Sequence, residues 1–473
     1  MKRLTLLFAL SLLASLARPA AAQSTNAPAP GWISEPLSLP DALNIAIRQN
    51  ATILNAGSDL EATQGLIVQT RAVALPTLQA TGQYKYNDPN SIENFGYVPQ
   101  ANQGWNSGIQ LVQNIYTGGT LRAAFQAVRA ERSQALANYQ ATLSDTLLSV
   151  EVAYYDVLLA AQQITVNEAS VNLLTKELAD QQSRYNAGTV PHFNVLQAEV
   201  ALANARPPLI QARSTYRNNK NTLSNLLGYN LPKEVVNDIP FNLTDNLDDH
   251  PYSVNLSDAV QKALGQRPEL QALRQSTELQ RLSIIDAQSG YKPTVAVFAG
   301  YSWRSAQFTQ PLDLTHEYDG WNAGGQITWN IFDGGMTQGK ITQARAQYQK
   351  AQTTLADEAR TIELEVRTAY SDFIEAVETL DSQNKVVEVA EEALREARAR
   401  SDAGSGTQLD VLNAETSLTQ SRTTQIRALH DYDTARARLE RAIGNHLINP
   451  PAKEFSPVRG QFVPTSSRNQ TLP

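Results

Sequence analysis

The sequence contains no cysteine among its 473 residues. This absence excludes disulfide bonds, thiolate metal sites, cysteine nucleophiles and a lipid-modified N-terminal cysteine. Basic residues are not in excess either, because 46 acidic residues outnumber 39 lysines and arginines and give a net charge of −7. That balance argues against a nucleic-acid partner, which normally requires a basic face. The five histidines lack metal-ligand spacing, so we expect no metal, no cofactor and no enzymatic activity.

Long hydrophobic runs are also absent, except at the N-terminus. Lys2 and Arg3 precede the apolar run Leu4–Leu16, and three alanines end at Ala22, so residues 1–22 are predicted to be a secretory signal peptide. The alternative, an anchoring helix, is disfavoured because a spanning helix needs about 20 apolar residues. No later run approaches that length, which argues against an α-helical membrane protein. Residues 23–36, rich in Pro, Ala, Ser and Asn, are expected to be flexible.

The remainder of the chain contains an internal repeat of two copies. A stretch Trp-Asn-x-Gly-x-Gln, followed by Asn-Ile-aromatic-x-Gly-Gly, begins at Trp105 and again at Trp321. We therefore predict one pseudo-symmetric body rather than several unrelated domains. The expected organisation is repeat 1 over 37–229, an equatorial linker over 230–253, repeat 2 over 254–445, and a C-terminal equatorial segment and tail over 446–473.

Each repeat predicts a helix, two strands, a very long helix and a return helix. The first helix is expected over 41–75, with a counterpart that ends before Pro293. From Thr120 to Ala187 there is neither Gly nor Pro, which corresponds to roughly 100 Å of helix. Apolar residues in this stretch alternate at intervals of four and three, which predicts coiled-coil packing. Return helices should end near Leu227 and Ile443, and Pro207-Pro208 should kink the first one.

Four segments alternate between apolar and polar residues over about the 9–11 residues of a tilted transmembrane strand. They are 77–86, the stretch after Trp105, 294–303 and 321–332. Aromatic residues cluster at both ends, as at two membrane interfaces; a soluble sheet with one wet face is the alternative. The connections 87–104 and 304–320 are expected to be outward-facing loops. One belt comprises Tyr84, Tyr86, Trp105, Tyr301, Trp303 and Trp321, and the other Tyr116, Trp329 and Phe332.

Four strands cannot stand alone in a bilayer, because the edge N–H and C=O groups would be unsatisfied in hydrocarbon. Two copies would give eight strands, whose interior is filled by side chains, whereas three copies would give twelve strands and room for a channel. We therefore predict a homotrimer.

The repeated stretch, the two Ala-Gly turns and Asp410-Val411-Leu412 resemble the TolC outer-membrane efflux protein family over residues 37–445. The resemblance implies a mostly α fold with transmembrane β structure, in which each chain gives four strands to a trimeric 12-stranded β-barrel continued by a long α-helical barrel. It also implies an outer-membrane location, with the helical part in the periplasm. The implied function is a passive exit duct for tripartite drug efflux pumps or type I secretion. The implied partners are a periplasmic adaptor and, through it, an inner-membrane transporter of the ABC, RND or MFS type.

The resemblance places a periplasmic constriction at Asp410 and Asn413, with Asn194 and Gln197 at the matching places of repeat 1. The family carries two acidic rings there, so Asn413 is a departure that halves the expected ring charge. Acidic rings favour cations. The alternative for Asp410 is a solvated surface carboxylate.

The turns after the long helices resemble the tips where the family docks its adaptor hairpins. Helix caps with glycine in the left-handed conformation are the simpler alternative, and both can hold together. The family often carries an Arg at the place of Gly406 that helps to latch the mouth, so the latch of this chain must differ or be weaker. The tip residues are Gly188, Thr189, Val190, Gly404, Ser405 and Gly406.

There are two alternatives to the exit duct. One is an enzyme with a phosphate-binding loop, because residues 334–340 match that motif, but Ile341 stands where the Mg²⁺-binding Ser or Thr is required. A soluble periplasmic coiled-coil adaptor would explain the long helices and the signal peptide, but not the four belted strands. The cargo, drug or protein, is not encoded in any motif that we recognise.

Overall fold

The computed structural model describes most of the two repeats. The predicted signal peptide and the tail 446–473 lie outside the described residues, as do most of the 23–36 segment and much of the linker. Among the described helices, none combines the length and the apolar character needed to span a membrane. The described ranges are 36–91, 101–229, 239–240, 242–247, 251–306 and 317–445.

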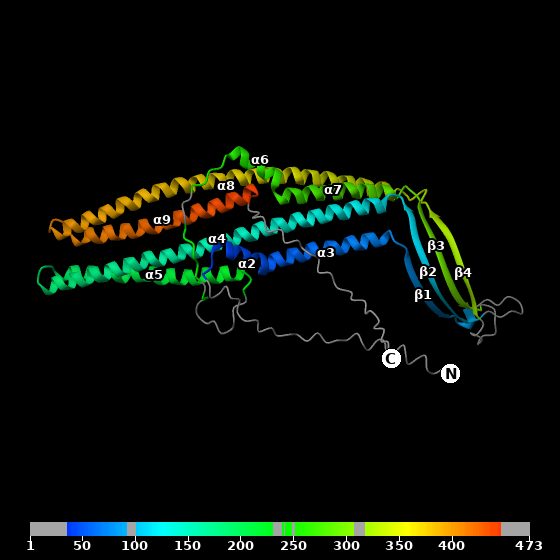
Figure 1. Ribbon diagram of the computed structural model, residues 1–473, viewed down its shortest axis with the longest axis horizontal. Coiled ribbons are helices and arrows are strands. Elements are labelled where there is room, and N and C mark those ends of the chain that lie inside the picture. Colours follow the sequence, from blue (N-terminus) through cyan, green and yellow to red (C-terminus); the bar gives the residue numbers. More distant parts are fainter. Residues whose placement is uncertain are drawn as a thin grey trace, which may run out of the picture.

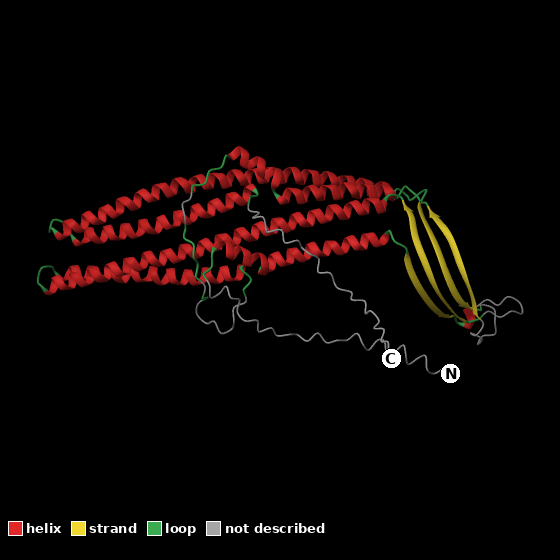
Figure 2. Cartoon of the chain, viewed as in Figure 1, coloured by secondary structure: helices red, strands yellow, loops and turns green. Residues whose placement is uncertain are grey.

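The two repeats contribute the same series of elements, with the long helices side by side and one sheet at their end (Figure 1). The chain is mostly helical with antiparallel strands, as predicted (Figure 2). Repeat 1 contains α2 (Leu39–Gln49), α3 (Ala51–Val73), β1 (Thr77–Tyr86), a short 3-10 helix (Pro89–Ser91), β2 (Gln103–Thr117), α4 (Thr120–Asn186) and α5 (His192–Leu226). Repeat 2 contains α6 (Leu256–Gln266), α7 (Pro268–Ser289), β3 (Thr294–Ser305), β4 (Glu317–Thr328), α8 (Met336–Asp402) and α9 (Gln408–Ile443).

The first helix of each repeat is broken, and the prediction of one continuous helix over 41–75 was wrong. Asn50 takes an extended conformation between α2 and α3, and its side chain accepts hydrogen bonds from the N–H groups of Thr52 and Ile53. Such side-chain acceptors start a new helix. Arg267 is extended between α6 and α7 because Pro268 follows it, and a residue before proline avoids the helical region.

The four strands form one antiparallel sheet in the order β1-β2-β3-β4, so β2 and β3 join the two repeats at its centre. The prediction of the last strand over 321–332 was wrong in its bounds, because β4 starts at Glu317 and ends at Thr328. Thr328 pairs with Thr294, the first residue of β3, and no partner strand continues beyond it. The predicted outer loops are correspondingly shorter, since β2, β3 and β4 extend into them.

The long helices lie as predicted, and α4 serves both repeats. It packs against α3 and α5 of its own repeat and also against α7 and α9 of the other. Repeat 1 buries a core around Val150, Tyr154 and Leu223, and repeat 2 buries one around Phe373 and Leu439. The return helix α5 continues through Pro207 and Pro208 as one helix.

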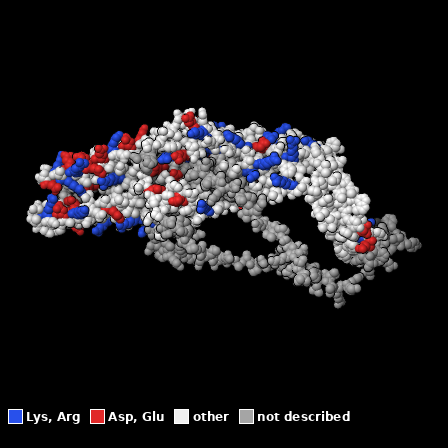
Figure 3. All heavy atoms as spheres, viewed as in Figure 1, with Lys and Arg blue, Asp and Glu red and all other residues white. Residues whose placement is uncertain are grey.

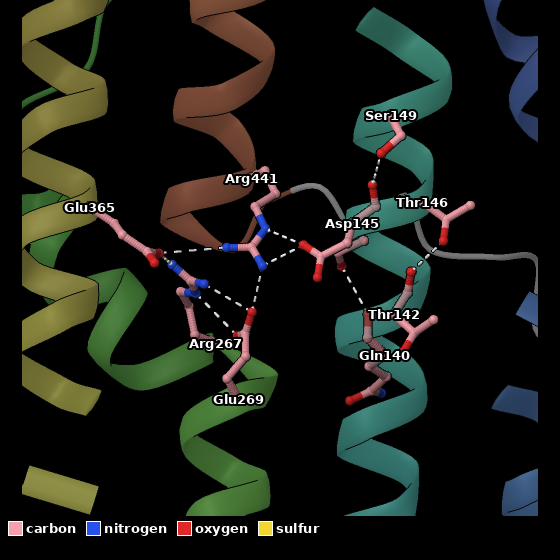
Figure 4. Close-up of polar contacts among 10 residues, drawn as sticks. Gln140, Thr142, Asp145, Thr146, Ser149, Arg267, Glu269, Glu365 and Arg441 are labelled. Atoms are coloured by element: carbon pink, nitrogen blue, oxygen red, sulfur yellow. Dashed lines mark hydrogen bonds and ion pairs between the residues drawn. The ribbon is translucent and has the colours of Figure 1, made fainter. Parts of the chain in front are cut away.

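An ionic cluster joins four helices of both repeats where α6 and α7 meet (Figure 4). Arg267, only 3% exposed, bonds to Glu269 at 2.9 Å and to Glu365 of α8. Arg441 of α9 bonds to Glu269 at 2.7 Å and to Asp145 of α4. A buried guanidinium requires such partners, because an unpaired charge is costly to bury.

Candidate channel mouth and membrane-facing sheet

One face of the sheet carries most of its large apolar and aromatic side chains. Tyr84 pairs directly with Trp105, and Tyr301 pairs directly with Trp321. Directly paired residues project from the same face. Trp321 is 80% exposed in the single chain, so no described residue covers most of its side chain. The register therefore aligns residues of both repeats into one aromatic row at the end of the sheet away from the helices.

The second aromatic group lies at the helix end of the sheet. A bulge between Asn114 and Tyr116 brings Tyr116 opposite Val295 on the apolar face. Trp329 and Phe332 follow the end of β4, and Phe332 is 89% exposed. The bulge shifts the alternation by one residue, so that Tyr116 lies on the same face as Trp105 and Ile109. The opposite face is mostly polar or small, with Gln79, Gln110, Asn322 and Gln326 among its residues, but it also carries the paired Val112 and Phe298.

Both helical turns lie at the far end of the molecule from the sheet (Figure 1). Gly188 has φ +76° and Gly404 has φ +72°, so each ends its long helix in the left-handed conformation. Thr189 and Ser405 are exposed, whereas Val190 and Gly406 are half-buried. The geometry of both turns is thus that of glycine helix caps. Their exposed residues are also accessible to a partner.

Asp410 forms part of a capping box at the start of α9. Its backbone N–H donates to the Thr407 hydroxyl at 3.2 Å, and its carboxylate accepts the Thr407 N–H at 3.0 Å. The Thr407 hydroxyl and N–H, together with Arg400, hold the pKa of the exposed Asp410 carboxyl below its usual range. The side chain is therefore ionised at neutral pH and fixed to the helix end. The spacing Thr-x-x-Asp was the signal for this box in the sequence.

The corresponding start of α5 has no such cap. Pro191 occupies the cap position and has no side-chain acceptor, and the Asn194 N–H donates only to the Pro191 carbonyl, at 3.1 Å. Asn194 is half-buried and Asn413 is exposed. Within the described part of this single chain, Asn194 and Gln197 form no hydrogen bond with Asp410 or Asn413.

Gln197 instead lines a groove of about 930 Å³ between α4, α5 and α9. The groove exposes apolar side chains at its rim, including Phe193 and Val200 of α5 and Leu409 of α9. Exposed apolar residues at helical spacing favour contact with another helix.

Polar links that sequence reasoning missed join the two hairpins near their tips. The Nε2 of Gln181, a buried residue of α4, donates to Gln408 of α9 and to Glu177, both at 2.9 Å. Arg184 of α4 pairs with Asp402 of α8 at 3.3 Å. One sequence feature could have indicated the Gln181 link. Gln181 follows the buried Leu174 by seven residues, so this polar side chain lies where the helical repeat expects an apolar one.

Gly406 packs against the last turn of α8. A Cβ atom there would lie 3.0 Å from the Arg400 Cβ and 3.1 Å from the Ser401 nitrogen. A larger residue would therefore require a small local shift of the last turn of α8. The polar links near this turn start from Gln181 and Arg184 of α4.

His430 forms another link between the repeats, halfway along the helices. Its Nε2 lies 3.0 Å from Asp156 of α4, and its Nδ1 lies 3.0 Å from Asp431. Burial lowers the pKa of His430, but the hydrogen bonds and charges of the two carboxylates outweigh this effect and raise the pKa above its usual value. The contact with Asp156 connects α9 to α4, and the protonated form of His430 can donate to both carboxylates.

The glycine pair that resembled a phosphate loop forms the bend from sheet to helix. Gly334 has φ +68° and Gly335 has φ +89°, and the matching Gly118 and Gly119 are also left-handed. Asp333 accepts hydrogen bonds from the N–H groups of Gly335 and Thr337, so these donors are already used. In the described residues, no group of three His, Asp or Glu side chains is arranged to hold a metal ion.

Comparison with known sequences matches both repeats to one family. The model of that family, described as outer membrane efflux protein, matches residues 42–229 and 259–445. The outer membrane protein TolC of Vibrio cholerae is 23% identical over 408 residues, covering 86% of this chain and 90% of that protein. The proteases secretion protein PrtF of Dickeya chrysanthemi is 23% identical over 400 residues, covering 81% and 83%.

Comparison with solved structures gives the same fold. The outer membrane protein VceC of Vibrio cholerae superposes with a TM-score of 0.70 at 21% identity, covering 86% of this chain and 96% of that one. This likeness shows a shared fold over most of both chains.

Proposed function

Because this chain belongs to the outer membrane efflux protein family, we propose that three copies close into one 12-stranded barrel, continued by a helical barrel. The protein is an exit duct of the outer membrane for efflux or type I secretion, with its helical part in the periplasm. The family is one of transport proteins rather than of enzymes. The soluble-adaptor alternative was wrong, since the matched relatives are outer-membrane proteins.

The open edges of the sheet support the closure most directly. β1 and β4 each pair on one side only within the described chain. Unpaired backbone groups cost several kcal/mol each in hydrocarbon, so the edges need partner strands. Joining β4 of one copy to β1 of the next satisfies both edges, and three copies give a barrel wide enough for a channel. A neighbouring copy would also cover the apolar rim formed by Phe193, Val200 and Leu409.

Cross-linking tests the closure, because the chain has no native cysteine to interfere. Cysteine at Thr81 of β1 should be combined with cysteine at Asn322, Gly324 or Gln326 of β4, all on the polar face. We expect one combination to give a covalent ladder that ends at three chains. Cysteine at Gln110 of the inner strand β2 should give no ladder with the same β4 positions. A ladder that ends at two or four chains would refute the trimer.

At the other end, we propose that Asp410 lines the periplasmic mouth of the duct. Its carboxylate is exposed and ionised, and three copies would form one acidic ring. Asn413 lies about one helical turn away and adds no charge, while Asn194 and Gln197 make the repeat 1 side of the mouth neutral. Such a ring favours cations.

The links Gln181–Gln408 and Arg184–Asp402 are proposed to hold this mouth closed, since they tie the helices of repeat 1 to those of repeat 2. The exposed turns at Gly188, Thr189 and Val190 and at Gly404, Ser405 and Gly406 are proposed as the docking tips for a periplasmic adaptor. The adaptor would connect the duct to an inner-membrane transporter. Deleting the gene, followed by a drug-sensitivity panel and a comparison of secreted proteins, distinguishes drug cargo from protein cargo.

A further inference from the structure

The chain passes between helices and sheet four times, and each passage carries an exposed cation. Arg71 lies in the last turn of α3 and Arg122 in the first turn of α4. Lys292 stands two residues before β3, and Lys340 lies near the start of α8. We propose that these four residues, the basic collar, bind the anionic headgroups of phospholipids in the periplasm-facing leaflet of the outer membrane. Figure 3 shows basic side chains gathered over the helices near the sheet, whose surface is largely uncharged.

The basic collar is not neutralised by the described part of the chain, where none of its four members forms an ion pair. Exposed cations farther along α8 behave differently, since Arg360 and Lys385 each pair with a carboxylate within about one turn. Two carboxylates lie near the junctions, Asp286 and Asp333. Asp333 accepts backbone N–H groups at the start of α8 and keeps its negative charge, so the two carboxylates offset only two of the four cations. The junctions thus keep a net positive charge.

The position of the collar matches a membrane interface. The indole N–H of Trp329 donates to the Tyr291 carbonyl at 3.1 Å, next to Lys292. Tryptophan and tyrosine prefer the headgroup level of a bilayer. The collar lies at the helix side of these rings, where the sheet leaves the membrane and where basic residues attract anionic lipid.

A phospholipid fits the collar better than free phosphate does. The four cations are distributed over four separate junctions across the width of the sheet, rather than converging on one point. Many headgroups side by side can each meet one cation, whereas a single phosphate cannot meet all four. The expected ligand has a net negative headgroup, such as phosphatidylglycerol, and zwitterionic phosphatidylcholine is the comparison.

Native mass spectrometry of the purified full-length protein, mixed with equal amounts of the two lipids, measures the preference. We expect the parent to retain several-fold more phosphatidylglycerol than phosphatidylcholine, and the variant R71Q/R122Q/K292Q/K340Q to retain them equally. The matched control R48Q/K176Q/R206Q/R217Q removes four exposed cations away from the sheet junctions and should keep the preference. The charge-keeping variant R71K/R122K/K292R/K340R should keep it too.

Added salt should weaken the preference in the parent, which supplies a test even if the glutamine variant does not assemble. A preference that persists in the glutamine variant, or one that is insensitive to salt, would overturn the proposal. Equal losses in the variant and in the matched control would overturn it as well, since total charge would then be the cause. Displacement of the lipid by millimolar inorganic phosphate would identify a simple anion site and refute the assignment to lipid.

Discussion

Replacing Val297 with arginine tests the assignment of the sheet faces near the middle of the membrane. Val297 lies on the apolar face of β3, pairs with Gly325 and is 42% exposed. Trp321 and Trp329 are eight residues apart, or roughly 27 Å along a strand. A tilt of about 40° reduces this separation to about 20 Å in depth, close to the apolar band of about 25 Å in such barrels. Val297, beside the midpoint of this interval, is therefore near mid-depth.

An arginine on the lipid face at mid-depth costs about 2–4 kcal/mol. The folding equilibrium of each chain should then fall roughly 30- to 700-fold, since about 1.4 kcal/mol corresponds to a factor of ten. Ala296→Arg is the matched control, because Ala296 pairs with Gln326 on the polar face, where a charge can be hydrated. Urea titration of folding into phospholipid bilayers, followed by gel mobility of the folded form, measures both. Equal costs at the two neighbouring positions would show that the faces are wrongly assigned.

Three further predictions concern the helices. Asp410→Asn should lower the cation-to-anion permeability ratio in planar bilayers, and Asn413→Asp should raise it. Thr407→Ala breaks the same capping box but keeps the charge, so it should leave the ratio unchanged; a changed ratio in Thr407→Ala would mean that the cap matters rather than the ring. Gln408→Ala should raise the open population of single channels roughly fivefold for each lost hydrogen bond of about 1 kcal/mol, and the exposed tip variant Ser405→Ala should not. The pKa of His430 is raised by folding, so the contribution of His430 to stability is complete below its ordinary pKa of about 6.5 and is lost as the pH rises through the folded pKa. The melting temperature of the parent should fall over this pH range, and His430→Gln should remove this part of the pH dependence. Parallel plots of melting temperature against pH for the two proteins would contradict the assignment.

Much of the fold could be predicted because its signals are local and repeated. The absence of Gly and Pro over α4 predicted its length, and the alternation in 77–86 predicted the bounds of β1. The end of β4 could not be predicted, because Trp329 and Ile331 continue the alternation after the partner strand β3 has no residues left to pair. A strand ends where pairing ends, and pairing depends on a segment elsewhere in the sequence.

The candidate mouth shows the same division between local and distant signals. The turns and the Thr407–Asp410 box depend on neighbours in sequence, and the latter could have been recognised from its spacing. The Gln181–Gln408 link joins residues 227 positions apart, so only the packing of α4 against α9 reveals it. The break at Asn50 was missed because one polar residue inside a periodic pattern does not by itself end a helix.

The unequal helix starts at the two turns have a mechanical consequence. α9 begins with a reciprocal cap between Thr407 and Asp410, whereas α5 begins behind Pro191 with no side-chain cap. The first turn of α5 is therefore easier to unwind than that of α9, by about 1 kcal/mol for the missing cap. In a ring of three chains, stiff and soft hairpins would alternate around the circumference. We expect such a ring to widen first at its three soft helix starts, which would give the opening a triangular outline.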